Sequence, residues 1–336
     1  METVLKLEHL KVNSIVEKIK SAKSILLSTH KQCDGDGLGA ILGLYHALKK
    51  INKDVRLFTV DEVPRKYHFL DFNNFLEIYE ESHPPIENTD LSLIFDTNDF
   101  RMVEPLYSEL SKKCEEVLFV DHHPILNDGP EPNTGSYIDT TAASTGEIAY
   151  SIIKSLDIEL DEKIARALYT SIVFDTQLFR FVKSASTSHL ISAELIKYEK
   201  DPEEIHRELF STYTIGKVAF LGHVLSKIEY HSKGQVAVLL IKDKYLHRHN
   251  LDVDDSRDII DMIMNIKELK CAALFREIKE GQYKLSLRSK GEAEILSVAE
   301  SFQGGGHLYA AGAYIEGEYE KIKQQTVDLL TQKLKS

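Results

Sequence analysis

The sequence predicts an α/β protein in which a doubly wound, mostly parallel sheet is followed by a smaller α/β domain with a mixed sheet. Three observations predict this class. Short apolar runs alternate with segments of helical periodicity over the first 212 residues. Three of these runs end directly in Asp or His, and the carboxyl ends of strands are where open α/β sheets bind ligands. After residue 230 the pattern changes to strands joined by short turns.

Four apolar, β-prone runs supply the predicted parallel strands: Ser24–His30, Val55–Val60, Leu91–Asp96 and Val117–His123. Segments with helical spacing separate them: residues 40–48, 65–80 and 101–113. A charged helical segment over residues 1–23 precedes the first strand. After the fourth strand the chain turns helical, with a helix that opens at Ser144 and others over 161–174, 186–199 and 202–209. Because parallel strands need long crossover connections, this alternation predicts a parallel sheet in residues 1–212.

The C-terminal part, residues 231–336, has its own set of predicted strands: Gln235–Ile241, Ala272–Ile278, Tyr283–Arg288 and Ala313–Glu316. Helices are expected over residues 254–266, 292–302 and 320–334. A helix over 213–228 fills a predicted linker, residues 213–230, which is expected to be semi-rigid because it is not rich in Gly or Ser. We expect the active site in the cleft between the two domains.

Composition narrows the class of protein. The chain has 336 residues, of which 43% are apolar and 28% charged, and no apolar run is long enough to span a bilayer. The first residues lack the pattern of a secretory signal, so a cytoplasmic protein is expected. The three cysteines, Cys33, Cys114 and Cys271, are too few and too widely spaced to indicate a disulfide framework or a Cys-rich zinc site.

The charge pattern limits the partners. Fifty-three acids against 41 bases give a formal net charge of −12, and no basic stripe of the kind that tracks long nucleic acid is present in the sequence. A nucleotide substrate is therefore expected to be small and held by a few local groups. Neither a long nucleic acid nor a membrane is expected as a partner.

Polar residues at the ends of predicted sheet strands, together with Asp175 at a helix end, form the candidate site: His30, Asp34, Asp36, Asp96, Asp121, His122, His123 and Asp175. Carboxylates gathered in one cleft repel each other, and divalent cations remove that cost. Four clustered carboxylates with imidazoles and no thiolate suit Mn²⁺ or Mg²⁺. Two such cations can share a hydroxide nucleophile and stabilise charge on a phosphoryl group. The pattern thus predicts metal-assisted hydrolysis of a phosphoester.

The two adjacent histidines are expected to have different roles. Consecutive side chains of an extended segment point to opposite sides, so His122 and His123 do not face the same group. One can bind a metal while the other faces the substrate.

The order of these motifs resembles the DHH phosphoesterase family. His30-x3-Asp34-x-Asp36-x2-Gly39, Asp96, Asp121-His122-His123 and Asp175 resemble its four motifs, and Arg288 with Gly304-Gly-Gly-His307 resembles the DHH-associated C-terminal domain. The resemblance covers nearly the whole chain and is strongest to the NrnA-type nanoRNase and 3′,5′-bisphosphate nucleotidase branch. Cys33 and Ala40 depart from the usual motif, which has proline and serine there, but neither position holds a metal.

The resemblance implies a role for each residue. It implies that His30, Asp34 and Asp96 hold one Mn²⁺, and that Asp36, Asp96, His122 and Asp175 hold the other, with Asp96 bridging. It implies that His123 touches the scissile phosphate and that Asp121 orients the site. It also implies that relatives are often dimers, so a homodimer is expected.

A substrate-binding role is expected for Arg288, Gly304, Gly305, Gly306 and His307. Successive glycine N–H groups can form an anion-binding concavity, and Arg can bind a phosphate with two parallel hydrogen bonds. A phosphate anchor at a set distance from two metals would select short substrates: nanoRNA, linear dinucleotides such as pApA or pGpG, or 3′,5′-bisphosphoadenosine.

Four other functions share part of this pattern. A cyclic-dinucleotide phosphodiesterase is the main alternative. An inorganic pyrophosphatase is disfavoured by the sequence around Arg288, and a processive exonuclease by the absence of further strand-tracking sequence. A nucleotide sensor without turnover is disfavoured because the candidate ligand set is intact.

Overall fold

The structure, a computed structural model, describes residues 12–72, 74–125, 135–183, 186–211, 213–253, 256 and 259–334. The chain divides into two compact units, residues 1–212 and 213–336, and each is described by itself. The first half of the helix expected over residues 1–23 lies outside the described residues. Within the described ranges, no helix has the length and apolar character needed to cross a membrane.

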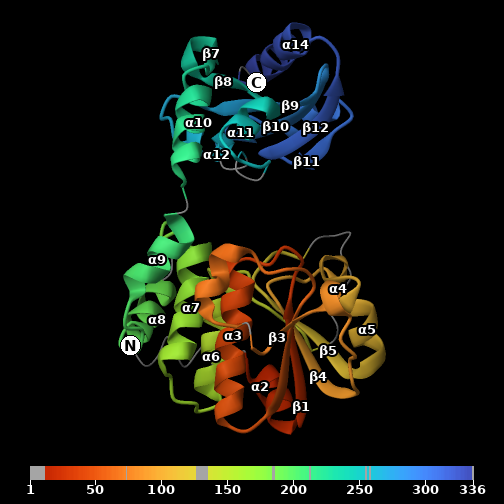
Figure 1. Cartoon of the computed structure of the whole chain (residues 1–336), viewed down its shortest axis with the longest axis vertical. Helices are drawn as coiled ribbons and strands as arrows, with labels where there is room; N and C mark the ends of the chain where they lie inside the picture. The colour runs from red at the N-terminus through yellow and green to blue at the C-terminus, as the bar shows by residue number, and fades with distance from the viewer. Residues whose placement is uncertain are drawn as a thin grey trace. The chain divides into compact units, whose positions relative to one another are not determined.

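The first unit is built on a six-stranded, all-parallel sheet, as predicted (Figure 1). Its strand order is β3-β2-β1-β4-β5-β6. The strands are β1 (Ser24–Thr29), β2 (Asp54–Thr59), β3 (Leu76–Ile78), β4 (Thr89–Phe95), β5 (Cys114–Asp121) and β6 (Tyr137–Ile138). The chain runs outward from β1 to β3 on one side and from β4 to β6 on the other. The strand order therefore reverses between β1 and β4, and the carboxyl ends at this reversal form the crevice in which such sheets bind ligands.

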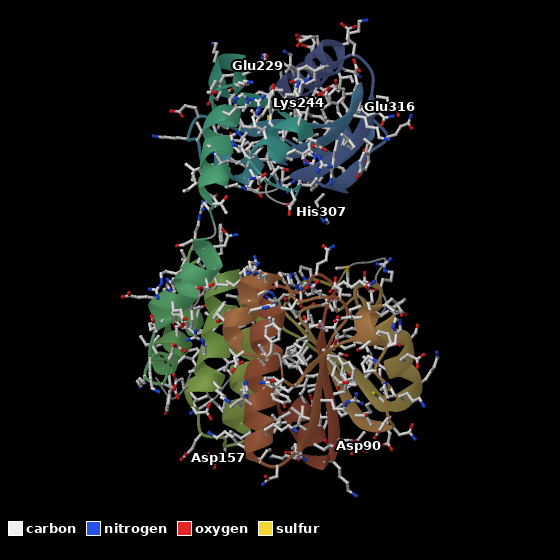
Figure 2. The ribbon with its side chains drawn as sticks, in the orientation of Figure 1. Asp90, Asp157, Glu229, Lys244, His307 and Glu316 are labelled. Carbon is white, nitrogen blue, oxygen red and sulfur yellow. The ribbon has the colours of Figure 1, made fainter. Side chains whose placement is uncertain are left out.

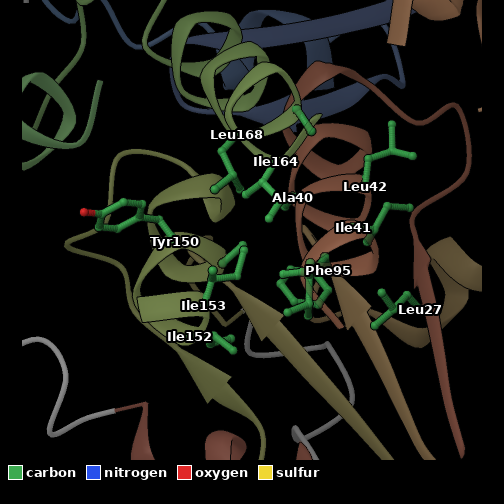
Figure 3. Close-up of a cluster of buried hydrophobic side chains, with 14 of the residues drawn as sticks. Leu27, Ala40, Ile41, Leu42, Phe95, Tyr150, Ile152, Ile153, Ile164 and Leu168 are labelled. Atoms are coloured by element: carbon green, nitrogen blue, oxygen red, sulfur yellow. The ribbon is translucent and has the colours of Figure 1, made fainter. Parts of the chain in front are cut away.

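Helices cover both faces of this sheet. One face carries α2 (Asn13–Ser21), α3 (Gly35–Lys50), α6 (Thr145–Ser155), α7 (Glu162–Asp175), α8 (Thr187–Leu195) and α9 (Pro202–Phe210). The other carries α4 (Tyr79–Ser82), the 3₁₀ turn η2 (Phe100–Val103) and α5 (Leu106–Lys113). Figure 3 shows part of the larger core, where Ile41 of α3, Phe95 of β4 and Ile164 of α7 are among the labelled side chains.

Helices α3 and α7 pack closely, and this contact places two candidate ligands. A Cβ at Gly39 of α3 would lie 2.4 Å from the carbonyl oxygen of Ala167 on α7, so only glycine allows the helices to approach this far. The candidate ligands Asp36 and Asp175 lie in the first turn of α3 and at the last residue of α7. The glycine contact therefore helps to bring the two carboxylates together.

Two predicted helices differ from the structure. Residues 65–80, expected to be helical, contain the 3₁₀ helix η1 (Arg65–Leu70), strand β3 and the short α4. Leu76 pairs with Leu57 of β2, so sheet pairing decides the structure of this segment. The helix expected over 101–113 is interrupted at Pro105, where α5 begins at the next residue.

The second unit contains the mixed sheet that the sequence predicts, with strand order β11-β12-β10-β9-β8-β7. Its strands are β7 (Glu229–His231), β8 (Val236–Lys242), β9 (Cys271–Lys279), β10 (Gln282–Ser289), β11 (Gly305–His307) and β12 (Ala310–Glu316). Strands β8 and β9 are parallel and the other neighbours are antiparallel.

Five helices and the 3₁₀ turn η3 (Ser232–Gly234) are described in this unit: α10 (Ile215–Leu225), α11 (Asp243–Arg248), α12 (Ile259–Ile263), α13 (Leu296–Glu300) and α14 (Tyr319–Lys333). Helices α13 and α14 pack on one face of the sheet, and α10, α11 and α12 pack on the other, over β8 and β9. Helix α10 lies in the expected linker, residues 213–230. Its Phe220, Leu221 and Val224 are buried in a core cluster with β8 and β9.

Candidate metal centre

The eight candidate residues lie at one end of the first sheet. His30 follows β1, Asp96 follows β4, and Asp121 ends β5, with His122 and His123 next in the chain. Because β1, β4 and β5 are adjacent and parallel, their carboxyl ends meet at one edge. The remaining three residues come from helices: Asp34 caps α3, Asp36 lies in its first turn, and Asp175 ends α7.

The side chains form three overlapping groups with the spacing of metal ligands, and one of them, Asp96 with Asp121, His122 and His123, shares Asp96 and His122 with the other two. Ligand atoms of His30, Asp34 and Asp96 lie within 4.8 Å of one another, and so do those of Asp36, His122 and Asp175. In the first group His30 Nε2 is 3.4 Å from Asp96 Oδ2. In the second, His122 Nε2 is 3.3 Å from Asp36 Oδ2 and 3.6 Å from Asp175 Oδ2.

Asp96 lies between the two groups. Its Oδ2 is near His30, and its Oδ1 is 3.6 Å from His122 Nε2. Its backbone φ is +64°, in the left-handed region that non-glycine residues seldom adopt. The backbone N–H of Asp96 donates a 3.1 Å hydrogen bond to the Val120 carbonyl of β5, which holds this conformation. The strained backbone thus points one carboxylate toward both groups.

Asp36 is fixed by the start of another helix. The backbone N–H of Thr145 donates to Asp36 Oδ2 at 2.8 Å, and that of Gly146 donates to Oδ1 at 3.3 Å. Both belong to the first turn of α6, where the helix dipole favours a negative charge. The Ser171 hydroxyl also donates to Oδ1. Ser171 is not among the residues predicted from the sequence, although it lies one turn before Asp175 on the same face of α7.

The two adjacent histidines face different surroundings, as their alternation predicts. The His122 side chain is 5% exposed and that of His123 is 55% exposed. His122 Nδ1 lies 3.2 Å from the Ala142 carbonyl, which leaves Nε2 directed at the carboxylates. His123 Nδ1 lies 2.9 Å from Asp121 Oδ1, and its ring is the more exposed of the two. One imidazole is thus placed for a buried ligand and the other for a molecule that arrives from solvent.

Asp121 is fully buried and organises this segment. Its Oδ1 accepts hydrogen bonds from the His122 N–H at 2.8 Å and from His123 Nδ1. Its Oδ2 accepts one from Asn98 Nδ2 at 2.6 Å, and the same Asn98 amide donates to the His123 carbonyl at 3.2 Å. Asn98 is likewise not among the predicted residues, and its only signal in the sequence is its position two residues after Asp96.

Charges in the site are strongly coupled. Burial lowers the pKa of His30, but its interaction with Asp96 and other nearby charges outweighs burial and raises the pKa to about 9. Burial also lowers the pKa of His122, and its carboxylate neighbours raise it to about 9. Burial and the charge of Asp96 raise the pKa of Asp34 to about 6 and that of Asp36 well above its usual value. Burial opposes ionisation of Asp96 as well, yet the neighbouring imidazoles of His122 and His30 hold its pKa below the usual range.

The donor set fits divalent cations. Asp96 Oδ1 and His122 Nε2 are buried and lack a hydrogen-bond partner within the described part of the chain. Unpartnered buried polar atoms are costly, so atoms of this kind commonly serve a ligand or a function. Four carboxylates and two imidazoles provide the oxygen-rich ligation, without thiolate, that Mn²⁺ and Mg²⁺ accept.

Metal binding should stabilise the first unit, because cations remove the repulsion between buried carboxylates. At a free Mn²⁺ concentration about 100 times the Kd, the melting temperature of this unit should rise by roughly 5–10 °C. Differential scanning calorimetry with and without Mn²⁺ measures this shift. Equal melting curves in wild-type protein would contradict a clustered cation site.

The candidate substrate residues lie in the second unit. Arg288 of β10 pairs with Ala310 of β12, which pairs with His307 of β11, so Arg288 and His307 share one face of the sheet. Arg288 Nε donates to Asp261 Oδ1 at 3.0 Å, and the His307 side chain is exposed (Figure 2).

The three glycines follow α13 and lead into the edge strand β11. The Gly304 N–H donates to the Ala299 carbonyl and closes α13, while Gly305 and Gly306 belong to β11. Gly306 has a φ of +141°, and a Cβ at Gly304 would lie 2.1 Å from the Gly312 carbonyl oxygen. Gly304 and Gly306 are thus required for the backbone path, a need that the sequence pattern does not distinguish from anion binding.

Two family models match the chain in sequence order. The model described as the DHH family, N-terminal domain, matches residues 24–172, and the model described as the DHHA1 domain matches residues 233–336. The chain contains a DHH-family N-terminal domain followed by a DHHA1 domain. The predicted family resemblance is therefore confirmed, and the second unit contains a DHHA1 domain.

Proteins of known name match over most of their length. The chain is 28% identical over 330 residues to the bifunctional oligoribonuclease and PAP phosphatase NrnA of Thermus thermophilus, covering 96% of this chain and 95% of that protein. It is 26% identical over 305 residues to the protein of the same name from Bacillus subtilis, covering 90% and 92%.

Solved structures show the same fold. An exopolyphosphatase-related protein from Bacteroides fragilis superposes with a TM-score of 0.83 at 23% identity and covers 97% of this chain and 98% of that one. An exonuclease RecJ bound to manganese superposes with a TM-score of 0.53 at 16% identity and covers 97% and 94%. At this level of identity the likeness concerns the fold alone.

Proposed function

We propose that this DHH-family protein hydrolyses short oligoribonucleotides and 3′,5′-bisphosphoadenosine with two divalent cations, Mn²⁺ or Mg²⁺. The family assignment makes the chain a hydrolase that acts on phosphoester bonds. The observation that carries the finer proposal is the position of Asp96, whose two oxygens face two separate groups of ligand atoms. The relatives named oligoribonuclease and PAP phosphatase support the choice of substrate.

Each group would hold one cation. His30, Asp34 and Asp96 would bind the first, and Asp36, His122 and Asp175 would bind the second, with Asp96 shared. Bound cations supply Lewis-acid activation of water and offset charge on the phosphoryl group. The protein contributes fixed geometry, because hydrogen bonds from α6 and Ser171 hold Asp36 in place.

His123 is proposed to contact the scissile phosphate. Its ring is the exposed one of the pair, and Asp121 holds Nδ1, so Nε2 can donate to a phosphoryl oxygen. Asp121 orients the imidazole and raises the pKa of His123, which favours the cationic form that binds an anion. Asn98 in turn orients Asp121.

The net charge of the chain favours a small substrate. The chain carries a net charge of −12, so long-range attraction of a polyanion is weak and a few local cations must bind the phosphates. Arg288 and His307 are proposed to bind the end of the substrate distant from the scissile bond. A homodimer and a cytoplasmic location stay predictions.

A substrate panel tests the proposed function. With Mn²⁺, the wild-type protein should hydrolyse pApA, pGpG, a five-nucleotide RNA and 3′,5′-bisphosphoadenosine. Cyclic dinucleotides and pyrophosphate in the same panel test the alternative functions. Rapid turnover of pyrophosphate or a cyclic dinucleotide, with linear substrates left intact, would contradict the proposal.

Arg288→Ala should reduce kcat/KM on dinucleotides roughly 10- to 150-fold, because a charge-assisted hydrogen bond contributes about 1.5–3 kcal/mol. The ratio of this value to kcat/KM on bis-p-nitrophenyl phosphate, which is too small to reach a distant anchor, should fall by the same factor. His307→Ala should show the same pattern more mildly. Arg248→Ala, an exposed arginine elsewhere in the second unit, is the control. An equal loss on both substrates in Arg288→Ala would assign Arg288 to catalysis or folding.

A further inference from the structure

Part of one face of the sheet in the second unit is left open by the helices. Helices α13 and α14 pack on one face, and the core cluster under α10, α11 and α12 on the other face includes residues of β8 and β9 but none of β10 or β12. On this second face, Lys284, Ser286 and Arg288 of β10 are exposed or half-buried. The Tyr314 side chain of β12 is 73% exposed.

Strand register arranges these side chains in rows, because paired residues of antiparallel strands share a face. The first row holds Arg288, Ala310 and His307; the second holds Ser286, Gly312 and Gly305; the third holds Lys284 and Tyr314. Adjacent rows on one face are roughly 6.6–6.8 Å apart. His307 and Glu316, both labelled in Figure 2, mark the two ends of this open face.

The middle row, Ser286 with Gly312 and Gly305, forms a flat floor for the open face because it carries almost no side chains. Ser286 contributes a hydroxyl, Gly312 contributes nothing, and a Cβ added at Gly305 would meet no atom within 4 Å. A hollow of about 1030 Å³ lies beside this floor, and its lining includes Lys284, Ser286, Gly305 and Tyr314. Small-molecule sites in proteins usually measure about 300–1,000 Å³, so the hollow is large enough for a nucleotide.

The Lys284 ammonium is the cation that this face offers to an anion. Within the described part of the chain, no carboxylate is within ion-pair distance of the Lys284 ammonium. Of the nearby acids, Asp261 is paired with Arg288, and Glu316, which also lines the hollow, accepts a 2.8 Å hydrogen bond from the neutral amide of Gln282. In a chain with net charge −12, an unpaired lysine beside an exposed tyrosine ring is a local cationic site.

An exposed aromatic ring next to spaced cations is the combination that binds single-stranded nucleic acid, by stacking on bases and pairing with phosphates. We propose that Tyr314 and Lys284 form a nucleoside subsite, in which Tyr314 stacks on one base of a short single-stranded oligonucleotide and Lys284 binds the adjoining phosphate. The subsite lies two rows from Arg288 and His307, so it serves a different nucleotide from the one that they anchor. The proposal rests on the proposed function and extends it to substrates of more than one nucleotide.

The test uses the full-length protein with Mn²⁺ and 5′-phosphorylated triadenylate. Tyr314→Ala should lower kcat/KM on this substrate ~5- to 150-fold, the effect of losing one stacked base. The loss should appear mainly as a higher KM, because stacking binds substrate and transition state alike. Tyr314→Phe, which keeps the ring, should retain the wild-type value. Tyr230→Ala is the matched control, since Tyr230 of β7 is also exposed, at the opposite edge of the sheet.

Lys284→Gln provides an independent test. It should lower kcat/KM on triadenylate. The slope of log kcat/KM against log salt concentration, which is negative, should become less steep by about 0.7, the value for one phosphate contact with a single strand. Lys279→Gln, an exposed lysine at the end of β9, should keep the wild-type slope.

Different results would overturn the proposed function and the nucleoside subsite. Wild-type protein that leaves every oligonucleotide intact overturns the proposed function and the subsite with it. Wild-type protein that cleaves triadenylate, with the same KM in Tyr314→Ala, overturns the subsite alone. A loss in Tyr314→Ala that is equally large on bis-p-nitrophenyl phosphate also overturns it, because a stacking subsite cannot act on a substrate without a nucleobase.

Discussion

Replacing Asp96 with Asn should abolish metal-dependent hydrolysis, with kcat reduced at least ~10³-fold, the upper range for loss of one preorganised electrostatic contact. The Asp96 carboxylate is 3.4 Å from His30 Nε2 on one side and 3.6 Å from His122 Nε2 on the other, so the substitution removes a negative charge from both ligand groups. Steady-state kinetics on pApA with Mn²⁺ and metal analysis of the purified variant measure the effect.

The backbone at this position favours Asn as the test residue. Asp96 has a φ of +64°, and Asn tolerates the left-handed region as well as Asp does. Asp157→Asn is the matched control, because Asp157 is exposed and has a φ of +57°. The control should keep wild-type activity and the Mn²⁺-dependent melting shift. Full activity in Asp96→Asn, or in wild-type protein after exhaustive chelation, would refute the two-cation proposal.

Alanine substitutions of His122 and of His123 should have different effects. His122→Ala should lower metal occupancy, because buried Nε2 faces Asp36, Asp96 and Asp175 and loses all three partners. Loss of a residue that only supports a ligand typically costs ~10–100-fold in metal affinity, so loss of the ligand itself should cost at least as much. Metal content by mass spectrometry measures this.

His123→Ala should keep both metals and lower kcat ~10²–10³-fold, because the exposed imidazole is proposed to stabilise charge on the phosphoryl group. His247→Ala, an exposed histidine in the second unit, is the control for both variants. Equal metal loss in His122→Ala and His123→Ala would mean that the two side chains are not divided between metal and substrate.

The sequence alone identified the residue types of the site and their places on the sheet. An apolar run that ends in a polar residue carries both pieces of information: the run predicts a buried parallel strand, and the polar residue lies at its carboxyl end. His30, Asp96 and Asp121 follow this rule, and the structure has them after β1, after β4 and at the end of β5. The alternation of side chains likewise predicted different surroundings for His122 and His123.

Some of the site had no signal in the sequence. Ser171 and the first turn of α6 hold Asp36 across separations of 135 and 109 residues, and Asn98 holds Asp121 across 23. Such contacts depend on how α3, α6 and α7 pack, and packing involves residues far apart in the chain. Strand β3 was missed for the same reason, since pairing with β2 decides the structure of a short segment with weak intrinsic preference.

The same distinction between what the sequence predicts and what tertiary contacts decide applies to the open face of the second sheet. The sequence predicted strands Tyr283–Arg288 and Ala313–Glu316. It did not predict that Lys284 and Tyr314 form one row, nor that the row lies beyond the helices. Only the tertiary structure decided these points, because the register of β10 with β12 and the extent of helix packing arise from contacts between segments distant in sequence.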